Sequence, residues 1–79
     1  MDKQITVTLL GATRKNNSVN GNPAFVLHTS EGDFRTQTDS AIAYEVQNHT
    51  GGPGSWIDKR VTLTVTERAR RVWGWELAE

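Results

Sequence analysis

The chain has 79 residues, no cysteine, and nine basic side chains against nine acidic ones. A chain of this length holds one hydrophobic core, so residues 1–79 are expected to form a single small domain. The absence of cysteine excludes disulfides and thiolate zinc sites and favours a reducing compartment, and zero net charge argues against a strong, non-specific nucleic-acid binder.

The first half of the chain has the pattern of three strands. Apolar and polar residues alternate over about residues 3–14, which predicts a half-buried strand. The Asn, Gly and Pro residues of segment 15–23 predict a loop. A second strand is expected at 24–29 and a third at 34–38, joined by a short hairpin turn in which Gly32 is available for a left-handed conformation.

The second half begins with a helix. Asp39 and Ser40 are both candidate N-caps for a two-turn helix over residues 41–48. A Gly- and Pro-rich loop follows at residues 50–55, and a strand in which Val and Leu alternate with Thr is expected at 61–66. A turn at 67–71 and a closing strand at 72–77 complete the chain.

The order of elements is therefore strand, strand, strand, helix, strand, strand. This order predicts a mainly β fold with one short helix, namely a small five-stranded antiparallel barrel that is OB-fold-like. Barrel closure would also remove exposed strand edges. An SH3-like barrel and an open sheet with a packed helix are the alternatives.

Several short segments carry a resemblance to other sequences. The segment Asn-Ser-Val-Asn-Gly-Asn-Pro at 17–23, the segment Thr-Asp-Ser-Ala at 38–41, Tyr44, Asn48 and segment 61–64 resemble small proteins of bacteriophages and prophages of actinobacteria. The resemblance extends over most of the chain. It implies a phage-encoded protein inside a bacterial cell, without an assigned activity or functional residues to transfer. No signal peptide or membrane-spanning run is recognisable, so a cytoplasmic location is expected.

The C-terminal part contains the most conspicuous candidate site. On a regular strand, Trp73 and Trp75 would share one face with Leu77. Such a pair could form a stacking platform for bases, beside arginines that hold phosphates. The alternative, which we favour, is that both indoles belong to the core of this small domain. The flanking arginines are Arg68, Arg70 and Arg71.

The charges are unevenly distributed along the chain. Residues 31–58 carry five acidic side chains and one basic one, whereas residues 59–71 carry five basic side chains and one acidic one. Lys59 and Arg60 extend the basic segment, which could meet an anionic partner. Trp56, at the junction of loop and strand, is either an exposed contact or, as we favour, an anchor for the loop.

Signatures of catalysis and of metal binding are missing from the sequence. His28 and His49 have no cysteine or closely spaced histidine partner, and no serine lies in a Gly-x-Ser-x-Gly motif. Asp33 and Asp39 are explained by a turn and a helix cap. We therefore expect a protein that is not an enzyme and needs neither a metal nor a cofactor.

Two functions of different classes follow, and a third remains. The sequence slightly favours a module that binds a host or phage protein, because the net charge is zero. The second is single-stranded DNA or RNA binding through an OB-like face, using the tryptophans and arginines named above. The third is a minor virion or assembly component that associates with itself, and a dimer would suit so small a domain.

Overall fold

The computed structural model describes residues 2–51, 54–66 and 68–78 of the chain. It has five strands and one helix in the predicted order, with boundaries close to the predicted ones. The elements are β1 (Asp2–Lys15), β2 (Ala24–Thr29), β3 (Gly32–Thr36), α1 (Ile42–His49), β4 (Arg60–Thr66) and β5 (Arg71–Leu77).

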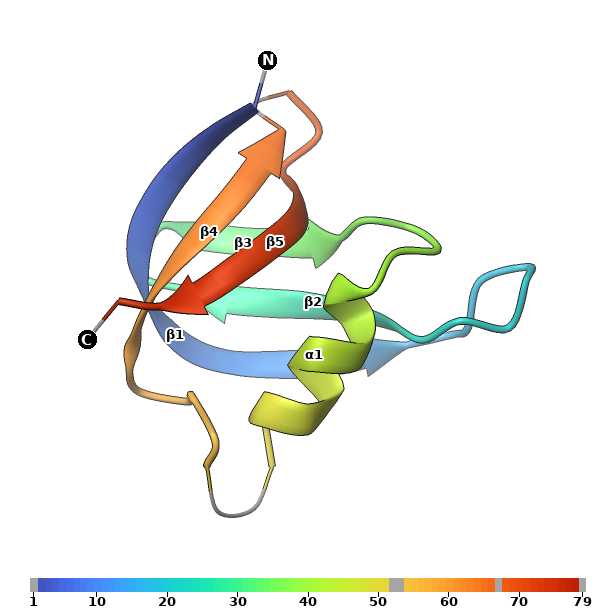
Figure 1. Cartoon of the computed structure of the whole chain (residues 1–79), viewed down its shortest axis with the longest axis horizontal. Coiled ribbons are helices and arrows are strands. Elements are labelled where there is room, and N and C mark those ends of the chain that lie inside the picture. The colour runs from blue at the N-terminus through green and yellow to red at the C-terminus, as the bar shows by residue number, and fades with distance from the viewer. Residues whose placement is uncertain (1, 52–53, 67, 79) are drawn as a thin grey trace.

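The strands close into a barrel in the order β1-β2-β3-β5-β4, as Figure 1 shows. The long strand β1 makes this closure possible: its first half pairs with β4 and its second half with β2. A register shift between Leu9 and Gly11 separates the two halves, and such irregularities let a strand bend. We call each pair of hydrogen-bonded neighbouring strands a seam of the barrel. Four of the five seams are antiparallel, and the β3–β5 seam is parallel. The fold is a closed five-stranded barrel of the OB-like or SH3-like kind, so the open-sheet alternative is wrong, and the sheet is mixed instead of wholly antiparallel as predicted.

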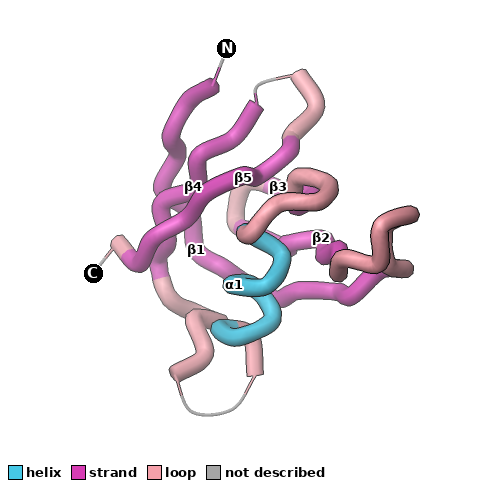
Figure 2. Tube along the Cα trace, turned by 45° about the vertical axis from the view of Figure 1, so that its right-hand side comes forward, coloured by secondary structure: helices cyan, strands magenta, loops and turns pink. Residues whose placement is uncertain are grey.

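The barrel interior holds the hydrophobic core. Strand β4 shows the predicted alternation, since Val61, Leu63 and Val65 are buried and the threonines between them are half-buried. Helix α1 adds Ile42, Ala43 and Val46 to the same core. In Figure 2 the helix lies against the strands, and the β1–β2 loop extends away from the barrel. At eight residues, the one helix among the described segments is too short to cross a membrane.

The predicted helix cap is wrong. Helix α1 begins at Ile42, and no side chain caps its N-terminus. Asp39 has a left-handed backbone, with φ of 55°, and its carboxylate binds the β1–β2 loop instead of the helix. Ser40 Oγ donates a hydrogen bond backwards, to the carbonyl of Gln37. Both side chains thus hold the connection that precedes the helix.

The expectation that Trp73 and Trp75 share a face is also wrong. Val72 pairs with Val65 and Gly74 pairs with Thr64, so β5 has one extra residue at this point. This is a β-bulge, and it breaks the two-residue alternation. Trp75 therefore packs against the core together with Val72, whereas Trp73 is exposed over 47% of its surface.

Candidate binding face on strands β2, β3 and β5

Arg70, one of the predicted site residues, is held by other parts of the chain. Its Nε and Nη2 atoms donate hydrogen bonds to the carbonyls of Asp33 and Glu31, at 2.9 and 2.7 Å. Its guanidinium also lies 4.0 Å from the centre of the Phe34 ring. Arg70 has a left-handed backbone conformation, with φ of 51°. The side chain therefore fastens the β4–β5 turn to the β2–β3 turn.

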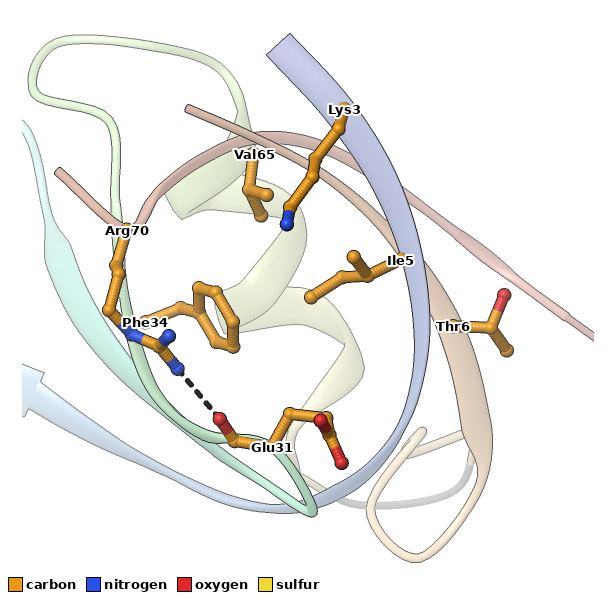
Figure 3. A pocket seen from close by; sticks show the side chains of 7 residues that line it. All are labelled: Lys3, Ile5, Thr6, Glu31, Phe34, Val65 and Arg70. Carbon is orange, nitrogen blue, oxygen red and sulfur yellow. Dashed lines mark hydrogen bonds between the residues drawn. The ribbon is translucent and has the colours of Figure 1, made fainter. Parts of the chain in front are cut away.

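These contacts lie at the mouth of the barrel, which is open. A pocket of about 410 Å³ is lined there by Ile5, Phe34 and Val65 and by three longer side chains, Lys3, Glu31 and Arg70. Figure 3 looks into this mouth, with Lys3 and Glu31 reaching in from different sides and Arg70 over Phe34. The dashed line marks the bond from Arg70 to the Glu31 carbonyl.

Arg71 lies on the outer face of the barrel, beside Arg35. The two residues are partners in the parallel β3–β5 register. Arg71 Nη1 donates to the carbonyl of Thr36 at 3.4 Å and to the hydroxyl of Thr38 at 3.3 Å. These partners are neutral and do not compensate the positive charge of the guanidinium. They orient the guanidinium along β3.

Two adjoining grooves cover the outer face around Arg35. They measure about 390 and about 370 Å³, and both include Lys15, Val26 and Arg35 in their walls. Arg70 lines the first groove and Arg71 the second. The acidic side chain lining the first groove is Asp33, which contacts His28. Among the residues that the structure describes, cations thus outnumber acids in the walls of these grooves, although the whole chain is neutral.

Trp73 lies on β5, the strand that carries Arg71. Val72 points into the core, whereas Trp73, the residue inserted at the bulge, is exposed. The backbone bond from Gln37 N to the Val72 carbonyl, 2.7 Å long, keeps the end of β3 beside this part of β5. We call the surface formed by Lys15, Arg35, Arg71 and Trp73 the basic face.

The comparisons with known proteins do not add to this description. No protein-family model, curated protein or solved structure matched the chain. The candidate site therefore rests on geometry.

Of the other predicted site residues, Lys59, Arg60 and Trp56 lie away from the basic face. Arg60 begins β4, while Thr66 at its other end pairs with Arg71, a separation of about 20 Å along the strand. Lys59 precedes Arg60 and is exposed, as is Arg68 on the β4–β5 turn. The ring of Trp56 stacks on the ring of His49, with 4.3 Å between the ring centres, and its centre lies 4.7 Å from that of the Trp75 ring. Trp56 therefore anchors the loop before β4, which is the alternative that we favoured from the sequence.

The β1–β2 loop is braced by Asp39. Asn22, Ser18 and Asn20 donate hydrogen bonds to its carboxylate, and these bonds lower the pKa of Asp39 in that order of importance. The hydroxyl of Tyr44 donates to Asn22 Oδ1 at 2.9 Å. Several residues that carry the resemblance to phage proteins therefore meet in one polar network that positions the loop.

The sequence analysis did not identify Lys15 and Arg35 as members of the basic face. It also did not show that Thr13, His28 and Asp33 are joined by hydrogen bonds. His28 Nδ1 lies 2.9 Å from a carboxylate oxygen of Asp33, and His28 Nε2 lies 2.7 Å from the hydroxyl of Thr13. These residues come from three strands, so the pattern along the chain carried no signal of them. Among residues 2–51, 54–66 and 68–78, no three His, Asp or Glu side chains gather to hold a metal ion.

Proposed function

We propose that the protein binds single-stranded nucleic acid on its basic face. The observation that carries this proposal is the convergence of Lys15, Arg35 and Arg71 along adjoining grooves, with the indole of Trp73 exposed on the strand that carries Arg71. Side chains of this kind bind a single strand by neutralising phosphates and stacking on bases.

The electrostatics favour a phosphate backbone as ligand. Arg35 and Arg71 are side by side, and the hydrogen-bond partners of Arg71 are a carbonyl and a hydroxyl, not a carboxylate. A phosphate can therefore meet a guanidinium to which no acid of residues 2–51, 54–66 and 68–78 is hydrogen-bonded, and it can do so bidentately. Each phosphate neutralised releases counterions, so the affinity should fall steeply with salt.

The fold supports the same location. In OB-folds the face of strands β2 and β3, with the β1–β2 and β4–β5 loops, is where oligonucleotides bind. Here the grooves lie on that face, and the β1–β2 loop beside them is held in place by Asp39. A fold alone does not determine function, so the charged side chains carry the argument.

A protein partner, which the sequence slightly favoured, is the second candidate. One observation supports it: Val19 is fully exposed at the tip of the β1–β2 loop, where a partner could cover it. The phage setting implied by the resemblance is compatible with either partner and stays a prediction.

The test is fluorescence anisotropy with labelled oligo-dT and oligo-rU of about 12 nucleotides, at about 50 and about 200 mM salt. The wild-type chain should bind, and Arg35→Glu should weaken binding at least about tenfold because it places an acid between two phosphate contacts. Trp73→Ala should weaken it by about 5-fold or more, the value of one stacked base. Neither residue is buried, so both variants should keep the wild-type circular dichroism.

Arg60→Glu is the matched control, because it makes the same change of net charge at the other end of β4. It should leave the affinity within about twofold of wild type, since screening limits charge effects beyond about 10 Å. No binding of either oligomer at low salt would overturn the proposal. Equal losses in Arg35→Glu and Arg60→Glu would show attraction by net charge and not by the basic face.

A further inference from the structure

Thr13, His28 and Asp33 form a hydrogen-bonded chain across three strands. His28 and Asp33 are directly opposite each other in the β2–β3 register, and Thr13 on β1 is diagonal to His28. The distances are 2.7 Å from Thr13 Oγ1 to His28 Nε2 and 2.9 Å from His28 Nδ1 to Asp33 Oδ1. A hydroxyl, an imidazole and a carboxylate in this order are the parts of a nucleophilic triad.

The proton positions follow from the chemistry of the three groups. An ionised carboxylate accepts hydrogen bonds and cannot donate, so the Nδ1 atom of His28 carries a proton toward Asp33. The Nε2 atom of the neutral ring is then an acceptor, and it receives the hydroxyl proton of Thr13. This is the tautomer that a general base needs in order to remove a proton from a hydroxyl.

The chain of three lies in a groove that a solute can enter. All three residues line the same groove of about 390 Å³, together with Lys15, Arg35 and Arg70. The side chains of His28 and Asp33 are 41% and 65% exposed. In the strand register Thr13 is opposite Val26, and Val26 is opposite Arg35. A small acyl group lying over Val26 would therefore have the hydroxyl on one side and a guanidinium on the other.

We infer that this groove is an acyl-transfer site that hydrolyses small anionic esters, with Thr13 as the nucleophile. The Thr13 oxygen attacks the ester carbonyl carbon while His28 Nε2 takes its proton. The tetrahedral oxyanion is stabilised by the positive charge of Lys15 and Arg35. It collapses by expelling the alcohol, which takes the proton from His28. The acyl group is left on Thr13 Oγ1. Water then attacks the acyl carbon as His28 Nε2 takes a water proton, the bond from that carbon to Thr13 Oγ1 breaks, and Oγ1 takes the proton back from His28, which releases the acid and restores the hydroxyl.

This inference is independent of nucleic-acid binding, although both use Arg35. The positive charge of the groove selects the substrate class, because an ester with a second, ionised carboxylate is attracted to Lys15 and Arg35. Asp33 acts as a positioning residue, because it holds the tautomer of His28 without touching the substrate.

The experiment compares hydrolysis of p-nitrophenyl hemisuccinate, which is anionic, with that of p-nitrophenyl acetate. The wild-type chain should raise the hydrolysis rate of the anionic ester over its own rate in buffer by a larger factor than that of the acetate, and intact-mass analysis with peptide mapping should find a succinyl group on Thr13. Thr13→Val should lower the rate at least about tenfold, to the level of a lone imidazole, and Thr13→Ser should restore it. His28→Gln should abolish the adduct.

His49→Gln is the matched control, since it removes the other histidine of the chain. It should leave the rate unchanged. Rates equal in wild type and Thr13→Val, or equal losses in His28→Gln and His49→Gln, would show ordinary imidazole catalysis at the surface and overturn the inference. Hydrolysis no faster than buffer would leave the three residues with only a cross-strand hydrogen-bond role. Because Thr13 is exposed and His28 and His49 are partly exposed, all variants should fold, which circular dichroism checks.

Discussion

Asp39 illustrates how one side chain organises a loop. Its carboxylate accepts hydrogen bonds from the side chains of Asn22, Ser18 and Asn20, and it does so from a left-handed backbone that non-glycine residues seldom adopt. The free energy gained from hydrogen bonds to the charged carboxylate offsets the free-energy cost of the left-handed backbone conformation. The loop in turn holds its own backbone bonds, including Gly21 N to the Ser18 carbonyl at 2.9 Å.

The lowered pKa of Asp39 gives a prediction about acid pH. Because the folded pKa lies below the ordinary carboxyl value, the stabilisation is fully present above that value and is lost as the pH falls through the folded pKa. Asp39→Asn removes this dependence. We expect the amides of Ser18 and Gly21 to exchange faster in Asp39→Asn than in wild type at neutral pH, with a smaller further change in acid, as hydrogen exchange by NMR would show.

Glu45→Gln, an exposed substitution on α1, is the control and should exchange like wild type at both sites. If Asp39→Asn kept the wild-type protection of Ser18 and Gly21, the carboxylate would not be what holds the loop.

At the scale of elements, the β2–β3 turn depends on Gly32 and Arg70 together. Gly32 has φ of 99°, and a Cβ placed there would lie 3.0 Å from Arg70 Nη2. The same turn is held by the Thr29 hydroxyl, which donates to the Gly32 carbonyl at 2.7 Å. Any side chain at position 32 would therefore meet both an unfavourable backbone conformation and the Arg70 guanidinium at the barrel mouth.

Gly32→Ala should consequently lower the free energy of unfolding by about 1–2 kcal/mol, because the left-handed conformation is strained for alanine. The control is Gly51→Ala, since a Cβ at Gly51 would meet no atom within 4 Å and its φ is not left-handed. Urea denaturation of both variants measures the difference. An equally small change in the free energy of unfolding of both variants would show that Arg70 and the turn adjust to the added methyl group without loss of stability.

The bulge in β5 decides the roles of the tryptophans. With regular alternation, Trp73 and Trp75 would both be buried or both exposed. The extra residue between Val72 and Gly74 sends one indole to the core and leaves the other in solvent. A single inserted residue thus provides both a core side chain and the aromatic edge of the basic face.

At the scale of the whole molecule, the barrel is closed by seams of unequal length. Seven residue pairs join β1 to β4, whereas two join β3 to β5. Beside those two pairs, the backbone bonds Arg35 N to Arg70 O and Gln37 N to Val72 O hold the short seam. The basic face extends across this seam, because Arg35 is on β3 and both Arg71 and Trp73 are on β5.

We expect the β3–β5 seam to open before the rest of the barrel, since local opening follows the number of interactions lost. Hydrogen exchange should therefore be faster at the amides of Arg35 and Gln37 than at the hydrogen-bonded amides between β1 and β4. Saturating oligonucleotide should slow exchange at the seam, because a ligand that contacts both strands stabilises the closed form. Uniform protection around the barrel would mean that it opens only by global unfolding.

The sequence by itself determined the elements and the class of fold. The alternation of Val and Leu with Thr in β4, the turn residues before β2 and the helical spacing of Ile42 and Val46 are local patterns, and each has a local physical cause. The prediction failed where a distant partner competed with a local one. Asp39 is a good N-cap by sequence, yet the three donors of the β1–β2 loop take its carboxylate.

Only the tertiary structure decided which side chains meet. Lys15, Arg35 and Arg71 are far apart in the chain and become neighbours because β2 and β3 pair and β5 inserts beside β3. His28, apparently isolated in the sequence, gains Thr13 and Asp33 through the register of three strands. Strand register depends on pairing and on bulges anywhere along the strands, and a one-residue shift would move each of these side chains to the other face.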